Sequence, residues 1–376
     1  MRRHGKATLP LHGGSAPPWL FDRMVDLSGA IATVIIDEFG QAELLRRLSD
    51  PYWFQAFGCL LGFDWHSSGV TTTTMGALKV ALEPTEHGIL VAGGKGATSR
   101  RTPVELRESP FDLASVTRED LVRSSKLSAS VDAACVQDRY ELYHHTMVTT
   151  QDGDWCVVQQ GMDGETARRY HWADEDVDSF VEAPQTAICT QRKRETVLDL
   201  TAPGSDEIRD ISVDLASEPP ARLKRYLEPS QTTLASFGIP DPYGPHLDTE
   251  YHLPDRHDIT TADLSDRAIA QLEHAYERQV DGYEELVETD GIGRGSLRAL
   301  ALIGELLYDA EAARDDPAKF SYAHGGKDGI PYPVNRDRYD RSTSFLTEML
   351  EGAEVDQETK QTALDRLHAA TESITG

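Results

Sequence analysis

The chain has 376 residues, enough for two ordinary domains, and its 63 acidic and 37 basic side chains give a formal net charge of −26 at pH 7. This balance excludes recruitment of nucleic acid by a generally basic surface. Lys is sparse beside Arg, and an acidic, Lys-poor surface is typical of adaptation to molar salt, where a Debye length of about 3 Å makes net charge a poor guide to partners.

The first third of the chain is predicted to be helical. Apolar residues recur at helical spacing from Pro17 and Pro18 as far as Gly40, and a second short helix is expected over 41–48. A further helix is expected over 70–81. The glycine-rich segment 93–96 lacks P-loop spacing and is expected to be a loop. The set Thr117–Asp120 has the pattern of a capping box, which predicts a helix from there to about residue 136.

A β-hairpin is the clearest strand signal. Residues 139–150 are rich in β-formers, Asp152 and Gly153 form a turn pair, and 155–162 is predicted to return as the second strand. If the turn has two residues, Thr150 faces Trp155 and His145 faces Gln160. Residues 187–200 are expected to add further strands.

One face of this hairpin carries polar groups that are costly in a core. The predicted register places Glu141, Tyr143 and His145 beside Gln160, and Asp138 lies just upstream. This order of groups has some likeness to nuclease sites that hold Mg²⁺ or Mn²⁺ with carboxylates.

We therefore take Asp138, Glu141, His145 and Gln160 as candidate catalytic residues, with Asp138 and Glu141 as candidate metal ligands. The lysine usual in such sites is absent, and a glutamine stands where it would be. Packing of a polar face on another element, or another chemistry, remains an alternative. Next along the chain, Arg168 and Arg169 beside aromatic residues are candidates for gripping single-stranded DNA, unless they form a tight turn.

The C-terminal part contains a second candidate site. Five prolines indicate a linker over 229–260, and helices follow from 261 to 376. Between helices expected over 268–287 and 297–307 lies the run Gly291, Ile292, Gly293, Arg294, Gly295, Ser296. This run has the pattern of a helix–hairpin–helix turn.

Each residue type in the run has a physical purpose. Two glycines permit the positive φ of a tight reversal and let a phosphate approach the backbone. Ile292 fills the gap between the helices. The amides of Gly293, Gly295 and Ser296 are expected at a helix N-terminus, where the macrodipole favours an anion, and Arg294 and Arg298 can add phosphate contacts. A purely structural turn and a protein-binding turn are the alternatives.

The remaining composition points to an intracellular protein. No apolar run approaches the ~18 residues of a membrane span, and no secretory signal is present. The four cysteines form no CxxC pair, so we expect free, mostly buried thiols in a soluble, cytoplasmic protein with no membrane partner.

Several longer motifs resemble those of an archaeal and bacterial family called domain of unknown function 763. They are Leu9-Pro10-Leu11-His12, 54–58 with 62–72, Ser125-Lys126-Leu127, Val136-Gln137-Asp138, 142–145, 157–162, 168–172 and 323–333. The stretches are spread over most of the chain and are specific. The family's name assigns no activity, so the resemblance implies none.

Together these patterns predict an α+β domain over 1–228, the linker, and an all-α helix–hairpin–helix domain over 261–376. We expect a DNA-binding protein of repair or recombination, with metal-dependent nuclease activity as a further expectation. A non-enzymatic DNA-binding adaptor is one alternative. A helix–hairpin–helix glycosylase is another, since Asp315 and Asp316 follow the second helix at a suitable distance, although the lysine of lyase-type members is missing.

Overall fold

The computed structural model describes residues 18–63, 69–190, 192–220, 222–223, 266–321 and 336–375. The predicted linker over 229–260 lies outside the described residues, as do the motifs at 9–12 and 323–333. The fold is mixed α+β and mostly helical, with a helical C-terminal region.

A central sheet organises the molecule. Five antiparallel strands run in the order β1-β3-β4-β5-β6, and β8 pairs in parallel with β6. The small strands β2 and β7 pair separately. The strands are β1 (Ile89–Lys95), β2 (Val136–Gln137), β3 (Glu141–Thr150), β4 (Trp155–Asp163), β5 (Thr166–Ala173), β6 (Ala187–Thr190), β7 (Leu198–Asp199) and β8 (Phe320–Ser321).

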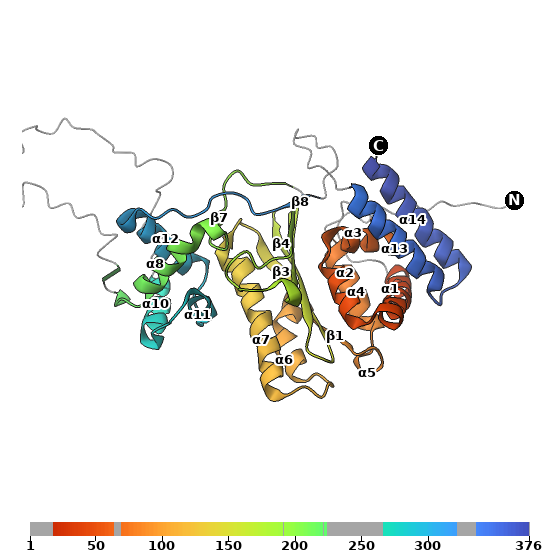
Figure 1. Ribbon diagram of the computed structural model, residues 1–376, viewed down its shortest axis with the longest axis horizontal. Helices are drawn as coiled ribbons and strands as arrows, with labels where there is room; N and C mark the ends of the chain where they lie inside the picture. Colours follow the sequence, from red (N-terminus) through yellow and green to blue (C-terminus); the bar gives the residue numbers. More distant parts are fainter. Residues whose placement is uncertain are drawn as a thin grey trace, which may run out of the picture.

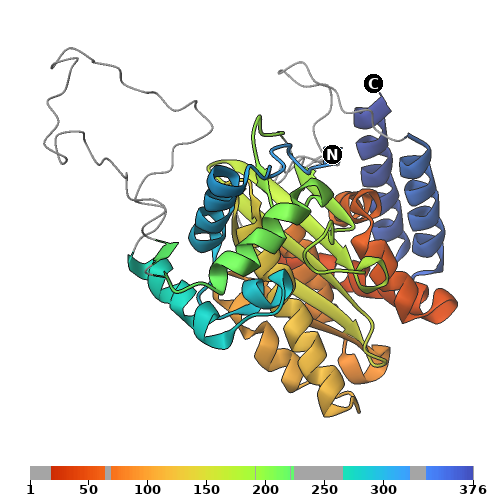
Figure 2. The same ribbon diagram turned by 60° about the vertical axis from the view of Figure 1, so that its left-hand side comes forward.

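Helices cover one face of the sheet from both parts of the chain. Alternation along β3 and β4 turns Val148, Cys156 and Val158 to this face, where they join one apolar core. Figure 1 shows the N-terminal helices and α13 and α14 together beyond the sheet, and Figure 2 shows the same grouping from a second side. These helices are α1 (Pro18–Phe39), α2 (Gln41–Ser49), α3 (Pro51–Leu61), α4 (Val70–Ala81), α13 (Arg336–Gly352) and α14 (Gln357–Thr375).

The opposite face carries the second core. Met147, Trp155 and Val157 point there and pack with apolar residues of α7 and of the C-terminal helices. Helices from the N-terminal and C-terminal parts therefore share both cores, α10–α12 on this face and α13–α14 on the other. The elements here are α6 (Thr102–Arg107), α7 (Ser115–Ser130), α8 (Asp206–Ala216), α10 (Asp266–Arg278), α11 (Tyr283–Glu288) and α12 (Arg294–Tyr308).

Short elements complete the chain at the edges. They are α5 (Pro84–His87) and the helical turns η1 (Gly96–Arg101), η2 (Val131–Cys135), η3 (Asp174–Asp176) and η4 (Pro203–Ser205). The four cysteines are free and buried, which confirms the prediction from their spacing. No helix in the described ranges is long and apolar enough to cross a membrane.

The predicted register of the hairpin was wrong by one residue. Thr149, not Thr150, faces Trp155, so His145 faces Gln159 and His144 faces Gln160. The cause is a longer loop, because the Thr150 amide donates to the Asp154 carbonyl and the Thr150 hydroxyl accepts from the amides of Asp152 and Asp154. An irregularity between Leu142 and His144 then shifts the pairing again near the start of β3.

Two other local predictions were wrong. The segment 93–96 was expected to be a loop, but residues 93–95 belong to β1, where Gly93 pairs with Thr146 of β3. The helix expected to begin with a capping box at Thr117 begins at Ser115 instead, and no side chain caps it. The helices expected over 41–48 and 70–81 are confirmed as α2 and α4.

Candidate functional site

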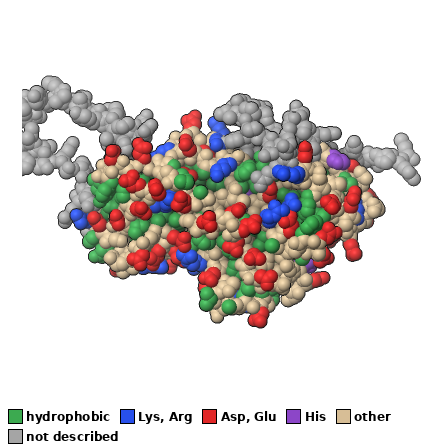
Figure 3. All heavy atoms as spheres, in the orientation of Figure 1, with side chains coloured by type: hydrophobic (Ala, Val, Ile, Leu, Met, Phe, Trp, Pro, Cys, Tyr) green, Lys and Arg blue, Asp and Glu red, His purple; other side chains and the backbone are tan. Residues whose placement is uncertain are grey.

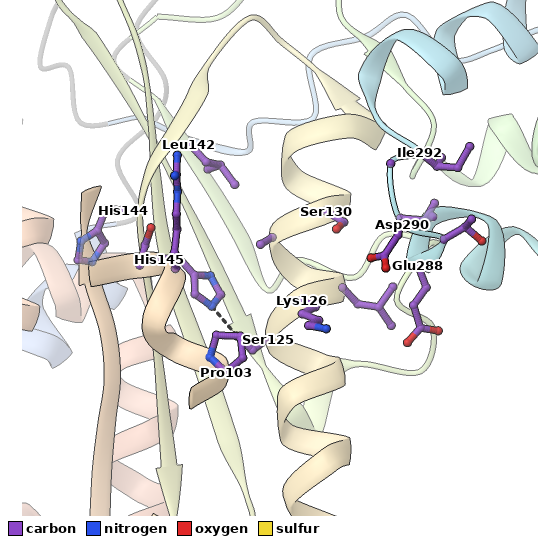
Figure 4. A pocket seen from close by; sticks show the side chains of 17 residues that line it. Pro103, Ser125, Lys126, Ser130, Leu142, His144, His145, Glu288, Asp290 and Ile292 are labelled. Carbon is purple, nitrogen blue, oxygen red and sulfur yellow. Dashed lines mark hydrogen bonds between the residues drawn. The ribbon is translucent and has the colours of Figure 1, made fainter. Parts of the chain in front are cut away.

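A pocket of about 450 Å³ lies between the sheet and the glycine turn. Ser125, Lys126 and Ser130 of α7 form one side of it, and residues 142 and 144–145 of β3 form another. Residues 99–100 and Pro103 contribute from η1 and α6. The segment 287–292, which runs from the end of α11 towards α12, also lines the pocket, and Figure 4 shows it on the other side of α7 from β3. The predicted hairpin site and the predicted DNA-binding turn therefore meet at one pocket.

A chain of four polar side chains ends at this pocket. The Ser125 hydroxyl lies 2.8 Å from Nε2 of His145, and Nδ1 of His145 lies 2.8 Å from Oε1 of Gln159. Nε2 of Gln159 donates to the Asp132 carboxylate at 2.6 Å. Ser125 and His145 line the pocket but are themselves largely buried, with 2% and 7% of their surface exposed, and Gln159 and Asp132 lie fully buried behind them in the core.

The direction of these hydrogen bonds follows from Gln159. Its Nε2 faces the Ser128 carbonyl, which can only accept, so that atom must be the amide nitrogen, and it also donates to Asp132. Its Oε1 then accepts from Nδ1–H of His145. The remaining nitrogen of His145, Nε2, is left with a lone pair and accepts the proton of the Ser125 hydroxyl.

Burial sets the charge states along this chain. It lowers the pKa of His145 to about 4, so the imidazole is neutral near pH 7 and keeps its lone pair. Burial also raises the pKa of Asp132 to about 8, although Gln185, Trp172 and Gln159 all donate to its carboxylate and lower the pKa. A hydroxyl, an imidazole and a group that orients the imidazole form the arrangement that nucleophilic catalysis requires.

The turn on the opposite side of the pocket has one glycine in a left-handed conformation. Gly291 has φ +92°, as expected of a tight reversal. Gly293 was also expected to need a positive φ, and this was wrong, because its φ of −151° is extended backbone. α12 begins directly after Gly293, and no side chain caps its first turn. A Cβ added at Gly295 meets no atom within 4 Å, so the first turn of α12 is open on that side.

Hydrogen bonds of Arg294 hold the turn against the sheet region. Its guanidinium donates to the carbonyls of Ala133 (3.2 Å) and Tyr140 (3.4 Å), and its own carbonyl accepts from Gln137 at 3.0 Å. Arg294 thus holds the turn in place, and this placement does not favour the phosphate contact predicted for it. The Ser296 hydroxyl donates to Gln271 of α10, and Arg298 is exposed.

Asp138 lies in a different cluster, around Arg168. The guanidinium of Arg168 donates to Asp138 at 3.0 Å and to Asp316 at 2.6 Å, and all three side chains are almost completely buried. Asp138 also accepts from the Tyr170 hydroxyl and the Tyr140 amide. Arg168, predicted to grip DNA, therefore has no exposed surface.

Arg169, the other arginine predicted to grip DNA, is also buried. Its guanidinium donates to Nε2 of His171 at 2.7 Å and to Oε1 of Gln55 at 3.2 Å, and it lies over the ring of Phe54. Both arginines belong to strand β5, not to the tight turn considered as an alternative.

The four predicted catalytic residues are not brought together. His145 lines the pocket, Asp138 pairs with Arg168, Glu141 is exposed at the start of β3, and Gln160 donates to the hydroxyl of Tyr143. Within the described ranges, no group of three or more His, Cys, Asp or Glu side chains could hold a metal ion. The arrangement of Asp138 and Glu141 therefore does not fit the predicted Mg²⁺ or Mn²⁺ site.

The sequence reasoning missed Ser125 and did not include Gln159 or Asp132 among the candidate site residues. One signal for Ser125 was available, since Ser125-Lys126-Leu127 is one of the motifs shared with the family. Gln159 was missed because the error of one residue in register put Gln160 in its place opposite His145.

The fold and the site define an α+β protein with a polar pocket between its central sheet and a glycine turn. Residues 5–334 match the model of a family described as Protein of unknown function (DUF763), and the chain belongs to this family. Comparisons with curated proteins and with solved structures found no match.

Proposed function

We propose that this protein binds the sugar–phosphate backbone of DNA at the turn 290–296 and acts in repair or recombination. The observation that carries the proposal is the uncapped first turn of α12, where Gly295 is exposed, directly after the Gly291–Gly293 reversal. Backbone amides at such a turn point outward, and the helix macrodipole favours an anion there. Gly295 leaves room for a phosphate to approach them.

Oriented amides suit this protein because its surface is acidic. Figure 3 shows Asp and Glu side chains spread over the visible face, with fewer Lys and Arg among them. Such a surface does not attract DNA as a whole, so binding must depend on local donors. Three exposed cations add positive charge close to the turn. Lys126 and Arg100 line the neighbouring pocket, and Arg298 lies on α12.

No specific observation favours the glycosylase alternative. A glycosylase needs an aspartate that faces the turn across a base-sized pocket. The pocket beside the turn is lined by Asp290 but by neither Asp315 nor Asp316. Asp316 instead pairs with the buried Arg168.

The test uses a charge placed at the open position. Gly295→Asp adds a carboxylate where phosphate would approach, while a negative charge in the first turn of a helix favours folding. Gly204→Asp is the matched control, because Gly204 is also exposed, lies near the start of α8 and has open space around its Cβ position. Binding of a labelled DNA duplex is followed by fluorescence anisotropy over a range of KCl concentrations.

We expect Gly295→Asp to weaken duplex binding at least about tenfold, the effect of roughly 1.4 kcal/mol of lost phosphate contact. The loss should be similar for different DNA sequences, because backbone contacts do not read bases. Gly204→Asp should bind like the wild type. Equal affinity of the two variants, both with wild-type circular dichroism spectra, contradicts the proposal.

A further inference from the structure

We propose that Ser125 is the nucleophile of a phosphodiester-transfer site, with His145 as the base that takes its proton. The substrate assignment rests on the proposed DNA binding at the neighbouring turn. The reacting phosphate would lie in the pocket between α7, β3 and the segment 287–292.

The orientation of Ser125 supports a nucleophile. A serine within a helix ordinarily bonds to a carbonyl of the preceding turn, and Ser128 does so with the carbonyl of Ser125. The hydroxyl of Ser125 is directed instead at the lone pair on Nε2 of His145. Gln159 and Asp132 fix that lone pair from behind. This row of hydrogen-bonded side chains thus polarises the Ser125 hydroxyl at the wall of the pocket.

The walls of the pocket suit a phosphorus centre. Lys126 and Arg100 line the pocket and have exposed side chains, and each could neutralise a phosphoryl oxygen. Two carboxylates also line it. That of Glu288 pairs at 3.0 Å with Arg123, which Glu284 shares at 2.6 Å, and that of Asp290 stands with Ile292 on the wall formed by the turn, as Figure 4 shows.

The second histidine of the strand, His144, is also neutral near pH 7 but lies on the other face of the sheet. Thr146 binds Nε2 of His144, and burial lowers the pKa of His144 to about 3, so this ring carries no charge near pH 7. Strand alternation turns His144 away from His145, as Figure 4 shows.

The reaction balances without an oxidant or a reductant. The Oγ of Ser125 forms a bond to phosphorus, and its proton moves to Nε2 of His145. The bond between phosphorus and the leaving oxygen of the strand breaks, and that oxygen takes the proton from His145. A phosphoserine diester remains, which water or a hydroxyl of another strand resolves by the reverse proton transfers.

The first experiment tests the nucleophile alone. A small alkyl fluorophosphonate reacts with an activated serine, because the Oγ–P bond forms and fluoride leaves. Peptide mass spectrometry should find the adduct on Ser125 in the wild type and none in Ser125→Ala. Ser130→Ala is the matched control, since Ser130 lines the same pocket and should leave labelling of Ser125 unchanged. His145→Gln should slow labelling at least about 100-fold.

If Ser125→Ala fails to fold, Ser125→Cys takes its place, because it nearly preserves volume, and it must lose the phosphonate adduct. Labelling of other residues alone, or an unlabelled wild type, overturns the assignment of Ser125 as a nucleophile.

The second experiment tests the substrate. A duplex with a bridging phosphorothiolate releases a thiolate that cannot rejoin the strand, so a phosphoserine link to DNA accumulates. We expect a detergent-stable adduct of wild-type protein and DNA that is absent in Ser125→Ala, while both proteins bind unmodified duplex equally by anisotropy.

The two proposals fail separately. Phosphonate labelling without a DNA adduct, in a protein that binds DNA, overturns the phosphodiester substrate. Phosphonate labelling in a protein that binds no DNA overturns the proposed function and, with it, the substrate assigned to this site.

Discussion

The buried pair Asp138–Arg168 offers a sharp test of what Asp138 does. The substitution Asp138→Ala removes the carboxylate that binds Arg168 at 3.0 Å, the Tyr170 hydroxyl at 2.6 Å and the Tyr140 amide at 2.9 Å. Asp316 would then be the one carboxylate of this cluster that still pairs with Arg168. The guanidinium is buried, so solvent cannot replace the lost carboxylate.

Breaking a buried ion pair from one side costs about 3–5 kcal/mol, against a total stability of about 5–15 kcal/mol for a typical protein. Divided by a urea dependence of about 1–3 kcal/mol per molar, this loss lowers the midpoint of unfolding by about 1–5 M. The control is Asp163→Ala, which removes a half-exposed partner of Arg194 and should cost only about 0–1 kcal/mol.

Urea titrations followed by circular dichroism measure both variants under the same salt. If Asp138→Ala shifts the midpoint no more than Asp163→Ala does, the structural role assigned to Asp138 is wrong. A metal-binding or catalytic role, by contrast, predicts little loss of stability on removal of the carboxylate.

Three further predictions concern the whole fold. Raising KCl should raise the thermal midpoint, because the net charge of −26 repels itself less when screened, and a midpoint that falls with added KCl contradicts this. Burial lowers the pKa of His144 to about 3 from about 6.5 in the unfolded chain, so its contribution to stability is present above pH ~6.5 and declines by about 1.4 kcal/mol per pH unit as the pH falls towards 3. The stability difference between wild type and His144→Gln, measured in urea, should therefore shrink on acidification from pH 6.5 to 5, and a constant difference would be inconsistent with a buried neutral ring. Gly93→Ala should destabilise the protein by about 1–3 kcal/mol more than Gly96→Ala, because both glycines have positive φ but only a Cβ at Gly93 collides with the carbonyl of His145; equal thermal shifts would refute this.

The helices could be predicted where the spacing of apolar residues within one short stretch of sequence was enough to identify them. Apolar residues at helical spacing are a local signal, and the predictions for α2 and α4 were correct within a residue. Strand β1 gave no such signal, because Gly93 and Gly94 have low β-propensity. Gly93 is held there by distant groups, since its amide donates to Glu105 and its carbonyl accepts from Lys79.

The candidate site depended on information that lies outside any single window. His145, predicted as a catalytic residue, lines the pocket, but its partners Ser125 and Gln159 come from α7 and β4, and Asp132, which binds Gln159, comes from η2. One extra loop residue before Asp152 and Gly153, Gln151, moved the pairing of His145 from Gln160 to Gln159. The two arginines of β5 look like surface cations in the sequence, because their carboxylate and amide partners lie as much as 148 residues away.

The sharing of one core by the first and last helices has a consequence for synthesis on the ribosome. Apolar side chains of α1 and α3 pack with Leu346, Met349 and Leu350 of α13 and with Leu367 of α14. Between Leu61 and Leu346, translation at about 5–20 residues per second takes on the order of 15–60 s. During that interval the nascent chain presents an unfinished apolar surface, so this protein should depend on chaperones that shield it until α13 emerges.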